Sequence, residues 1–163
     1  MHDYSIIIKS EMDKTSVRIN VGLEEQFMQL SRFCNLDRDA STVLVIDRTF
    51  DLSSMFATVT VFKQLDLLRG KSNDHPIMLG PILLSSDATE ETNRYFLTQL
   101  KWKLQNIELR GVMFNDEKFV LGSDQEKALI SAMKSLFPEA TRFFCVYHIS
   151  KIFEKNCETL GYL

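Results

Sequence analysis

The sequence is poor in the residues that mark several protein classes. Of its 163 residues, only three are cysteines, three are prolines and six are glycines. Three cysteines are too few, and odd in number, for a disulfide framework, so we expect the protein to work in a reducing compartment. The scarcity of glycine and proline excludes a collagen-like or low-complexity chain. A hydrophobic share of 45% excludes wholesale disorder.

Long apolar runs and an excess of basic charge are also missing. The longest apolar run extends from Pro76 to Leu84, far short of the ~20 residues of a membrane helix, so we expect no membrane partner. The first residues show no basic segment followed by an apolar one, so we expect no signal peptide. With 19 basic and 22 acidic side chains, the formal net charge is −3, and no basic block stands out. The sequence therefore offers no evident electrostatic means of holding a nucleic-acid backbone.

The hydrophobic pattern predicts a short lead-in and a longer core. Residues 1–40 contain two strand-like segments and then a helix that ends near Asn35. Residues 41–163 contain three strand-like segments in a row, followed by alternating helices and strands: strands at 43–47, 55–62 and 75–84, helix 88–104, strand 119–121, a helix up to Phe137, strand 142–146 and a last helix from His148. Such an order predicts an α/β domain with a mixed sheet, and an RNase H-like fold has that order. We expect the second core strand to be antiparallel to its neighbours, and the strand ending at Leu121 to lie beside the one ending at Asp47.

Local signals predict several details of these elements. Pro76, Gly80 and Pro81 indicate that the third core strand lies toward a sheet edge or contains a bulge. Two capping boxes predict helix starts, because an acid follows three residues after a side chain that can cap. The first has Asp87 as the N-cap, and the second spans 123–126.

Two aspartates occupy the positions most informative for chemistry. Asp47 follows a buried strand, and Asp124 follows the strand that ends near Leu121. If these strands are parallel neighbours, both carboxylates emerge at one edge of the sheet, within reach of shared Mg²⁺ ions. Asp124 also has a simpler interpretation, because an acid in the first turn of a helix is favoured by the helix dipole alone.

Four motifs in order carry a resemblance to a known family. They are Asp47-Arg48-Thr49-Phe50, the stretch Gly122 to Leu129 with Ala132, Phe137-Pro138-Glu139-Ala140, and Cys145-Val146-Tyr147-His148-Ile149. Over about residues 41–156 the chain resembles the Mutator-like element (MULE) transposase domain. The matching family patterns are D-x-T-[FY], D-x-x-x-A-L-x-x-A, F-P-x-A and C-x-x-H.

The resemblance implies a DDE-type catalytic core on an RNase H-like fold. Asp47 and Asp124 would be catalytic residues and ligands of Mg²⁺ or Mn²⁺, and the full-length parent would act on DNA, both transposon ends and target, in the nucleus. The family's third carboxylate, usually Glu, lies well downstream of the C-x-x-H motif. Glu154 and Glu158 follow His148 too soon to match it. We therefore expect a core that is truncated at the C-terminus and inactive alone.

Cys145 and His148 are possible active-site neighbours. As half of a zinc site with Cys157, they would lack a fourth ligand nearby, and as a nucleophile pair they would lack an orienting residue. The simpler interpretation buries Cys145 in a strand and places His148 at the start of the next helix.

Two alternative functions fit part of the pattern. The strand ending in Asp47-Arg48-Thr49 also resembles the opening of a haloacid-dehalogenase-type phosphotransferase, whose aspartate takes a phosphoryl group. That family wants paired acids on a later strand, whereas the corresponding place here offers Asp124 alone. The other alternative is a transposase-derived interaction module or relic without enzymatic activity. The oligomeric state stays open.

Overall fold

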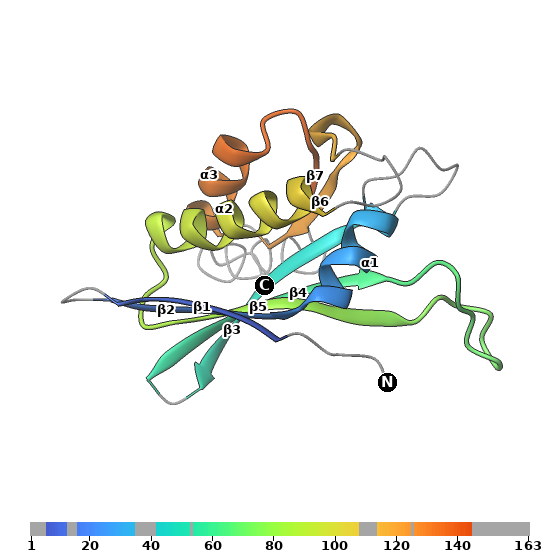
Figure 1. The fold of residues 1–163 in the computed structure, drawn as a ribbon, viewed down its shortest axis with the longest axis horizontal. Helices are drawn as coiled ribbons and strands as arrows, with labels where there is room; N and C mark the ends of the chain where they lie inside the picture. Colours follow the sequence, from blue (N-terminus) through green and yellow to red (C-terminus); the bar gives the residue numbers. More distant parts are fainter. Residues whose placement is uncertain are drawn as a thin grey trace, which may run out of the picture.

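A seven-stranded mixed sheet with three α-helices on one of its faces forms the protein in the computed structural model (Figure 1). The structure describes residues 6–12, 16–34, 42–52, 54–107, 114–124 and 126–144. In chain order the elements are β1 (Ile6–Met12), β2 (Val17–Leu23), α1 (Glu24–Cys34), β3 (Leu44–Leu52), β4 (Met55–Lys63), β5 (Ile77–Ser85), α2 (Glu90–Asn106), a 3-10 turn η1 (Asp116–Lys118), β6 (Val120–Ser123), α3 (Lys127–Leu136) and β7 (Thr141–Phe144). None of the described helices is long and apolar enough to cross a membrane.

The sheet order is β1-β2-β5-β4-β3-β6-β7. β4 is antiparallel to both β3 and β5, and β6 lies parallel beside β3, which confirms the expected mixed sheet. β7 continues the parallel part on the far side of β6. The two strands of the first forty residues extend the same sheet, because β2 pairs with β5. The division into a lead-in, 1–40, and a core, 41–163, stays a prediction.

The core lies between the sheet and its helices. It forms because apolar residues recur at helical spacing in α2 and α3 and at alternate positions in the strands. α2 buries Phe96, Leu97, Leu100 and Leu104, and α3 buries Leu129, Ala132 and Met133. Leu44 and Ile46 of β3 face them from the sheet, fully buried. Each such large side chain contributes roughly 1.5–3 kcal/mol to folding.

The start of α2 differs from its prediction. The N-cap is Thr89, whose hydroxyl accepts a hydrogen bond from Thr92 N at 3.2 Å. Asp87 lies outside the helix and accepts from Thr89 N at 3.0 Å and from the Thr92 hydroxyl at 2.6 Å. The predicted capping box at Asp87 is therefore wrong, because Thr89 reaches the free N–H of the first turn and Asp87 holds Thr89 in place.

The start of α3 also lies later than predicted. Ser123 belongs to β6, where pairing with Ile46 and Phe144 keeps it extended. The N-cap is Glu126, whose side chain makes no capping hydrogen bond. Asp124 is thus not a first-turn residue, and its Oδ1 accepts from Glu126 N at 3.2 Å. The predicted capping box at 123–126 is wrong, because strand pairing outweighs the local signal.

A bulge explains the glycine and proline in β5. The strand lies inside the sheet, between β2 and β4, so the edge interpretation is wrong. The bulge interpretation is confirmed, because the pairing with β4 shifts between Val59 and Val61, opposite Gly80 and Pro81. Thr60 Oγ1 donates to the Pro81 carbonyl at 2.7 Å. A Cβ on Gly80 would lie 2.4 Å from Thr60 Oγ1, so the bulge requires glycine for space.

The bulge predicts a position-specific effect of adding one methyl group. Gly80→Ala should lower the free energy of unfolding by about 1–3 kcal/mol, because a buried hydroxyl must move and its hydrogen bond to Pro81 weakens. Gly70→Ala is the matched control, since its Cβ would meet nothing within 4 Å. Urea denaturation of both variants measures the difference. Equal stability of the two variants would contradict the packing described here.

The Asp87 network predicts a pH-dependent contribution to stability. Burial raises the pKa of Asp87, but hydrogen bonds from Thr92 and Thr89 and the charge of Arg18 outweigh it, and the net pKa lies below its ordinary value. A depressed pKa stabilises the fold above the ordinary Asp pKa of ~3.9, and this stabilisation is lost as pH falls through the folded-state pKa.

Asp87→Asn should therefore cost about 1 kcal/mol at pH 7, and the difference from wild type should shrink as the pH is lowered toward 3. Urea denaturation at several pH values measures it. The exposed Asp74 provides the control, since Asp74→Asn should change stability by less than about 0.5 kcal/mol at pH 7. A difference for Asp87→Asn that stays constant down to pH 3 would exclude the ionised network.

Candidate active site

The parallel pairing of β3 with β6 brings the two candidate carboxylates together. Their register aligns Leu44 with Leu121, Val45 with Gly122 and Ile46 with Ser123. The next residue on each chain is Asp47 and Asp124, so the two aspartates follow the last register pair side by side. The sequence prediction that these strands are parallel neighbours is confirmed, and with it the basis for expecting the aspartates at one place.

The two aspartates reach this place in different ways. β3 does not end at Asp47, as the sequence suggested, but continues to Leu52, because β4 goes on pairing with it through Asp47↔Val59 and the residues that follow. β6 ends at Ser123, and Asp124 starts the connection to α3. Asp47 is therefore fixed in the middle of a strand, whereas Asp124 lies in a loop.

Both carboxylates line a groove on the face of the sheet that points away from the helices. Successive side chains of β3 point to opposite faces of the sheet. Leu44 and Ile46 are buried in the core on the helix face, whereas Val45 and Asp47 are not buried and lie on the other face. The groove has a volume of about 300 Å³, and its other lining side chains are mainly apolar, among them Val43, Val45, Phe143 and Phe144. Two half-buried carboxylates in an otherwise apolar groove are suited to binding a cation.

Directly behind Asp47, on the opposite face, lies the buried guanidinium of Arg48. This side chain is 2% exposed and contacts several separate segments. Its Nη2 donates to Asn93 Oδ1 of α2 at 2.7 Å, its Nη1 to the Ala88 carbonyl at 3.4 Å and its Nε to Thr58 Oγ1 of β4 at 3.4 Å. Its Nη1 also forms an ion pair with Glu126.

Glu126 lies between Arg48 and Asp124. Burial raises the pKa of Glu126 above its ordinary value, and the nearby charge of Asp124 adds to the rise, while Arg48 opposes it. The backbone N–H of Glu126 donates to Asp124 Oδ1. Arg48 and Glu126 therefore connect β3, which carries Asp47, with the segment between β6 and α3 that contains Asp124.

Sequence reasoning missed the Arg48–Glu126 pair. It treated Arg48 as the variable position of D-x-T-F and Glu126 as part of a capping box. A signal was present in the alternation, because a residue next to an outward-facing Asp47 on a central strand must point into the core. An arginine there requires a buried partner.

The donor set fits a hard divalent cation with few protein ligands. Carboxylate oxygens are what Mg²⁺ and Mn²⁺ prefer, and Mg²⁺ commonly keeps waters in its other coordination positions. Within the part of the chain that the structure describes, no three or more His, Cys, Asp or Glu side chains gather into a metal site. Asp47 and Asp124 would thus hold such an ion as a pair. Cys145, His148, Glu154 and Cys157 lie outside the described residues, and their roles stay predictions.

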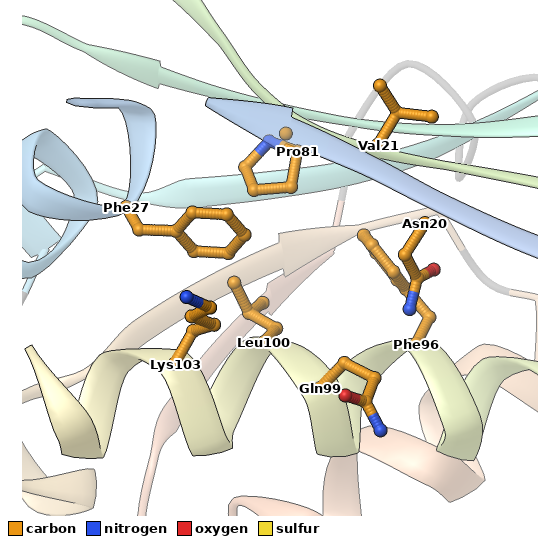
Figure 2. A pocket seen from close by; sticks show the side chains of 9 residues that line it. Asn20, Val21, Phe27, Pro81, Phe96, Gln99, Leu100 and Lys103 are labelled. Carbon is orange, nitrogen blue, oxygen red and sulfur yellow. The ribbon is translucent and has the colours of Figure 1, made fainter. Parts of the chain in front are cut away.

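A second cavity, shown in Figure 2, lies on the helix face between β2, β5, α1 and α2. Its lining is mainly apolar and includes Phe27, Pro81, Phe96 and Leu100, with Asn20, Gln99 and Lys103 as its polar members. Its volume is about 20 Å³, against the ~300–1,000 Å³ of typical small-molecule sites. This cavity is an imperfection of core packing and not a competing active site.

Comparison with known proteins identifies the family of this chain. The family model of the MULE transposase domain matches residues 43–152, which is more than half of the chain and includes Asp47, Asp124 and the motifs that follow them. No curated protein and no solved structure matches the chain. The mixed α/β sheet with its three helices is compatible with such a domain. The chain therefore belongs to the MULE transposase domain family.

Proposed function

We propose that this chain is part of a DNA transposase catalytic domain, in which Asp47 and Asp124 hold the divalent metal used for phosphodiester chemistry. The observation that carries the proposal is the β3–β6 register, whose last pair, Ile46 and Ser123, comes immediately before the two aspartates. Membership of the family supports a transposase-related function and DNA as the partner. A nuclear location goes with this function and is part of the proposal.

The order of the strands supports an RNase H-like fold for this core. Counted from β3, the five strands of the core lie in the order third, second, first, fourth, fifth along the sheet. The second is antiparallel to its neighbours, and the fourth and fifth are parallel to the first. We propose that the DDE-type site of such a fold lies where its first and fourth strands meet, which here is the place of Asp47 and Asp124.

The groove offers two features that phosphodiester chemistry uses, ligands for a metal ion and space for a phosphate group. A bound Mg²⁺ or Mn²⁺ would supply activation of a water or a 3′-hydroxyl and would offset the charge of the phosphate during in-line displacement. The carboxylates of Asp47 and Asp124 provide the oxygen ligands and a local negative charge that attracts the cation. The groove volume of about 300 Å³ leaves space for a phosphate group beside them.

We further propose that the chain alone neither binds DNA tightly nor cuts it. The described site offers Asp47 and Asp124, whereas a DDE-type enzyme uses three carboxylates. A formal net charge of −3 also gives little attraction for the DNA backbone. Neither the phosphotransferase alternative nor the interaction-module alternative gains a specific observation from the structure.

The proposed metal pair predicts a cation-dependent stabilisation. Millimolar Mn²⁺ should raise the melting temperature of the wild-type chain, because ligand binding to the folded state stabilises it. Asp47→Asn and Asp124→Asn should each abolish this Mn²⁺-dependent rise while preserving side-chain size. Asp74→Asn, an exposed acid far from the groove in sequence, is the matched control and should retain the rise. A rise that persists in both groove variants would exclude the site.

The proposed lack of isolated activity predicts a negative nuclease assay. Labelled duplex DNA incubated with Mn²⁺ and either wild-type chain or Asp124→Asn should remain intact in both samples. Fluorescence anisotropy at physiological salt should give a dissociation constant no tighter than the ~10⁻⁶ M of non-specific binding. Cleavage by the wild type that disappears in the variant would overturn the claim of inactivity while supporting the catalytic role of Asp124.

A further inference from the structure

The placement of Asp124 needs an explanation that the sheet alone does not give. Asp47 is held from both sides, since β3 pairs with β4 beyond it and with β6 before it. The register between β3 and β6 ends at Ser123, one residue before Asp124. A metal site requires its ligands to be held to within a fraction of an ångström of the productive arrangement. Some other contact must therefore restrain the loop that carries Asp124.

Glu126 supplies a restraint on that loop. Its backbone N–H donates to Asp124 Oδ1 at 3.2 Å, so the position of the Glu126 backbone orients the Asp124 carboxylate. Its own carboxylate caps no N–H of α3, although it occupies the N-cap position. The Glu126 carboxylate forms an ion pair with Arg48 instead.

Arg48 connects this restraint to the strand that carries Asp47. It is the next residue along β3, and it is fixed by Asn93 of α2 and by Thr58 of β4 in addition to Glu126. Because it is held from several directions, its guanidinium forms a rigid reference point on the helix face of the sheet. Asp47 precedes it on β3, and Glu126, which bonds to Asp124, forms an ion pair with it.

We infer that Arg48 and Glu126 are a positioning pair that sets the Asp124 carboxylate beside Asp47, so that divalent-cation affinity of the groove depends on an arginine that does not line it. This inference rests on the proposed function, because it assumes that the two aspartates hold the cation. Arg48 contacts neither cation nor substrate, and it acts through Glu126. Positioning contacts behind metal ligands typically change metal affinity by about 10–100-fold.

The direction in which Arg48→Met changes the Mn²⁺ affinity separates positioning from simple electrostatics. Arg48→Met removes a positive charge close to the groove, so Coulomb attraction alone would make Mn²⁺ bind more tightly. Positioning predicts the opposite, because the loop carrying Asp124 loses its anchor. Glu126→Ala breaks the same contact from the other side, and Glu126→Gln keeps a side chain of equal size that can still accept from Arg48.

Arg18 is the matched control. Arg18 and Arg48 are each 5% exposed, and Arg18 also bonds to the start of α2, with its Nε donating to Thr92 Oγ1 at 2.9 Å. It belongs to β2 and is not among the residues that line the groove of Asp47 and Asp124. Arg18→Met therefore removes an equally buried guanidinium, and a general loss of packing would affect both variants alike.

The experiment measures free Mn²⁺ by electron paramagnetic resonance during titration of the full chain, at fixed pH and physiological salt. Circular dichroism selects temperatures at which every variant is folded. Arg48→Met and Glu126→Ala should each weaken Mn²⁺ binding by about tenfold. The double variant should be no weaker than either single one, since both remove the same contact. Glu126→Gln should recover most of the affinity, and Arg18→Met should remain within about twofold of wild type.

Each outcome bears on one claim. If Asp47→Asn abolishes Mn²⁺ binding but Arg48→Met binds as tightly as wild type or more tightly, the positioning pair is wrong and the metal site stands. If Asp47→Asn leaves Mn²⁺ binding unchanged, the proposed function fails and the inference fails with it. If Arg48→Met does not fold, the comparison of Glu126→Ala with Glu126→Gln decides, because both variants lose the negative charge and only the glutamine can still accept from Arg48. Equal Mn²⁺ affinity of these two variants would overturn the positioning pair.

Discussion

The fold and the candidate site both depend on the parallel pairing of β3 with β6. The pairing is short, because β6 runs only from Val120 to Ser123. It requires the chain to cross from β5 to β6 over the sheet, and α2 makes that crossing while its apolar side covers the core. Two aspartates that are far apart in the sequence become neighbours only through this connection. The placement of the site therefore depends on the packing of α2 against the sheet.

The first turn of α2 organises the polar part of the structure. Two buried arginines meet it at consecutive residues, with Arg18 of β2 donating to Thr92 and Arg48 of β3 donating to Asn93. Burying a guanidinium costs several kcal/mol of desolvation, which must be offset by complete hydrogen bonding and by charge. Glu126 supplies that charge for Arg48. The start of one helix thus joins the strands of the first forty residues to the strand that carries Asp47.

The sequence predicted what depends on periodic patterns and missed what depends on contacts across the fold. The hydrophobic pattern predicted the strands and the helices, because such patterns reflect burial directly. Helix starts were misplaced, since a local capping signal cannot reveal that Ser123 is held in a strand by Ile46 and Phe144. The pairing of Arg48 with Glu126 joins residues 78 positions apart. Alternation along β3 indicates that Arg48 needs a buried partner, but no local pattern identifies Glu126 as that partner.

Because side chains alternate along β3, the register that buries Arg48 among its partners is also the register that places Asp47 in the groove. Arg48 faces the helices and Asp47 faces the groove, so a slip of one residue in the pairing would exchange their sides. Asp47 would then enter a core of leucine and phenylalanine without a partner, and Glu126 and Asn93 would lose the guanidinium that they bind. Both errors leave polar groups buried and unpaired, which costs far more than a displaced apolar residue. The buried Arg48 therefore disfavours any register that would remove Asp47 from the groove. Its bonds to Glu126 and Asn93 stabilise the register on which the site depends.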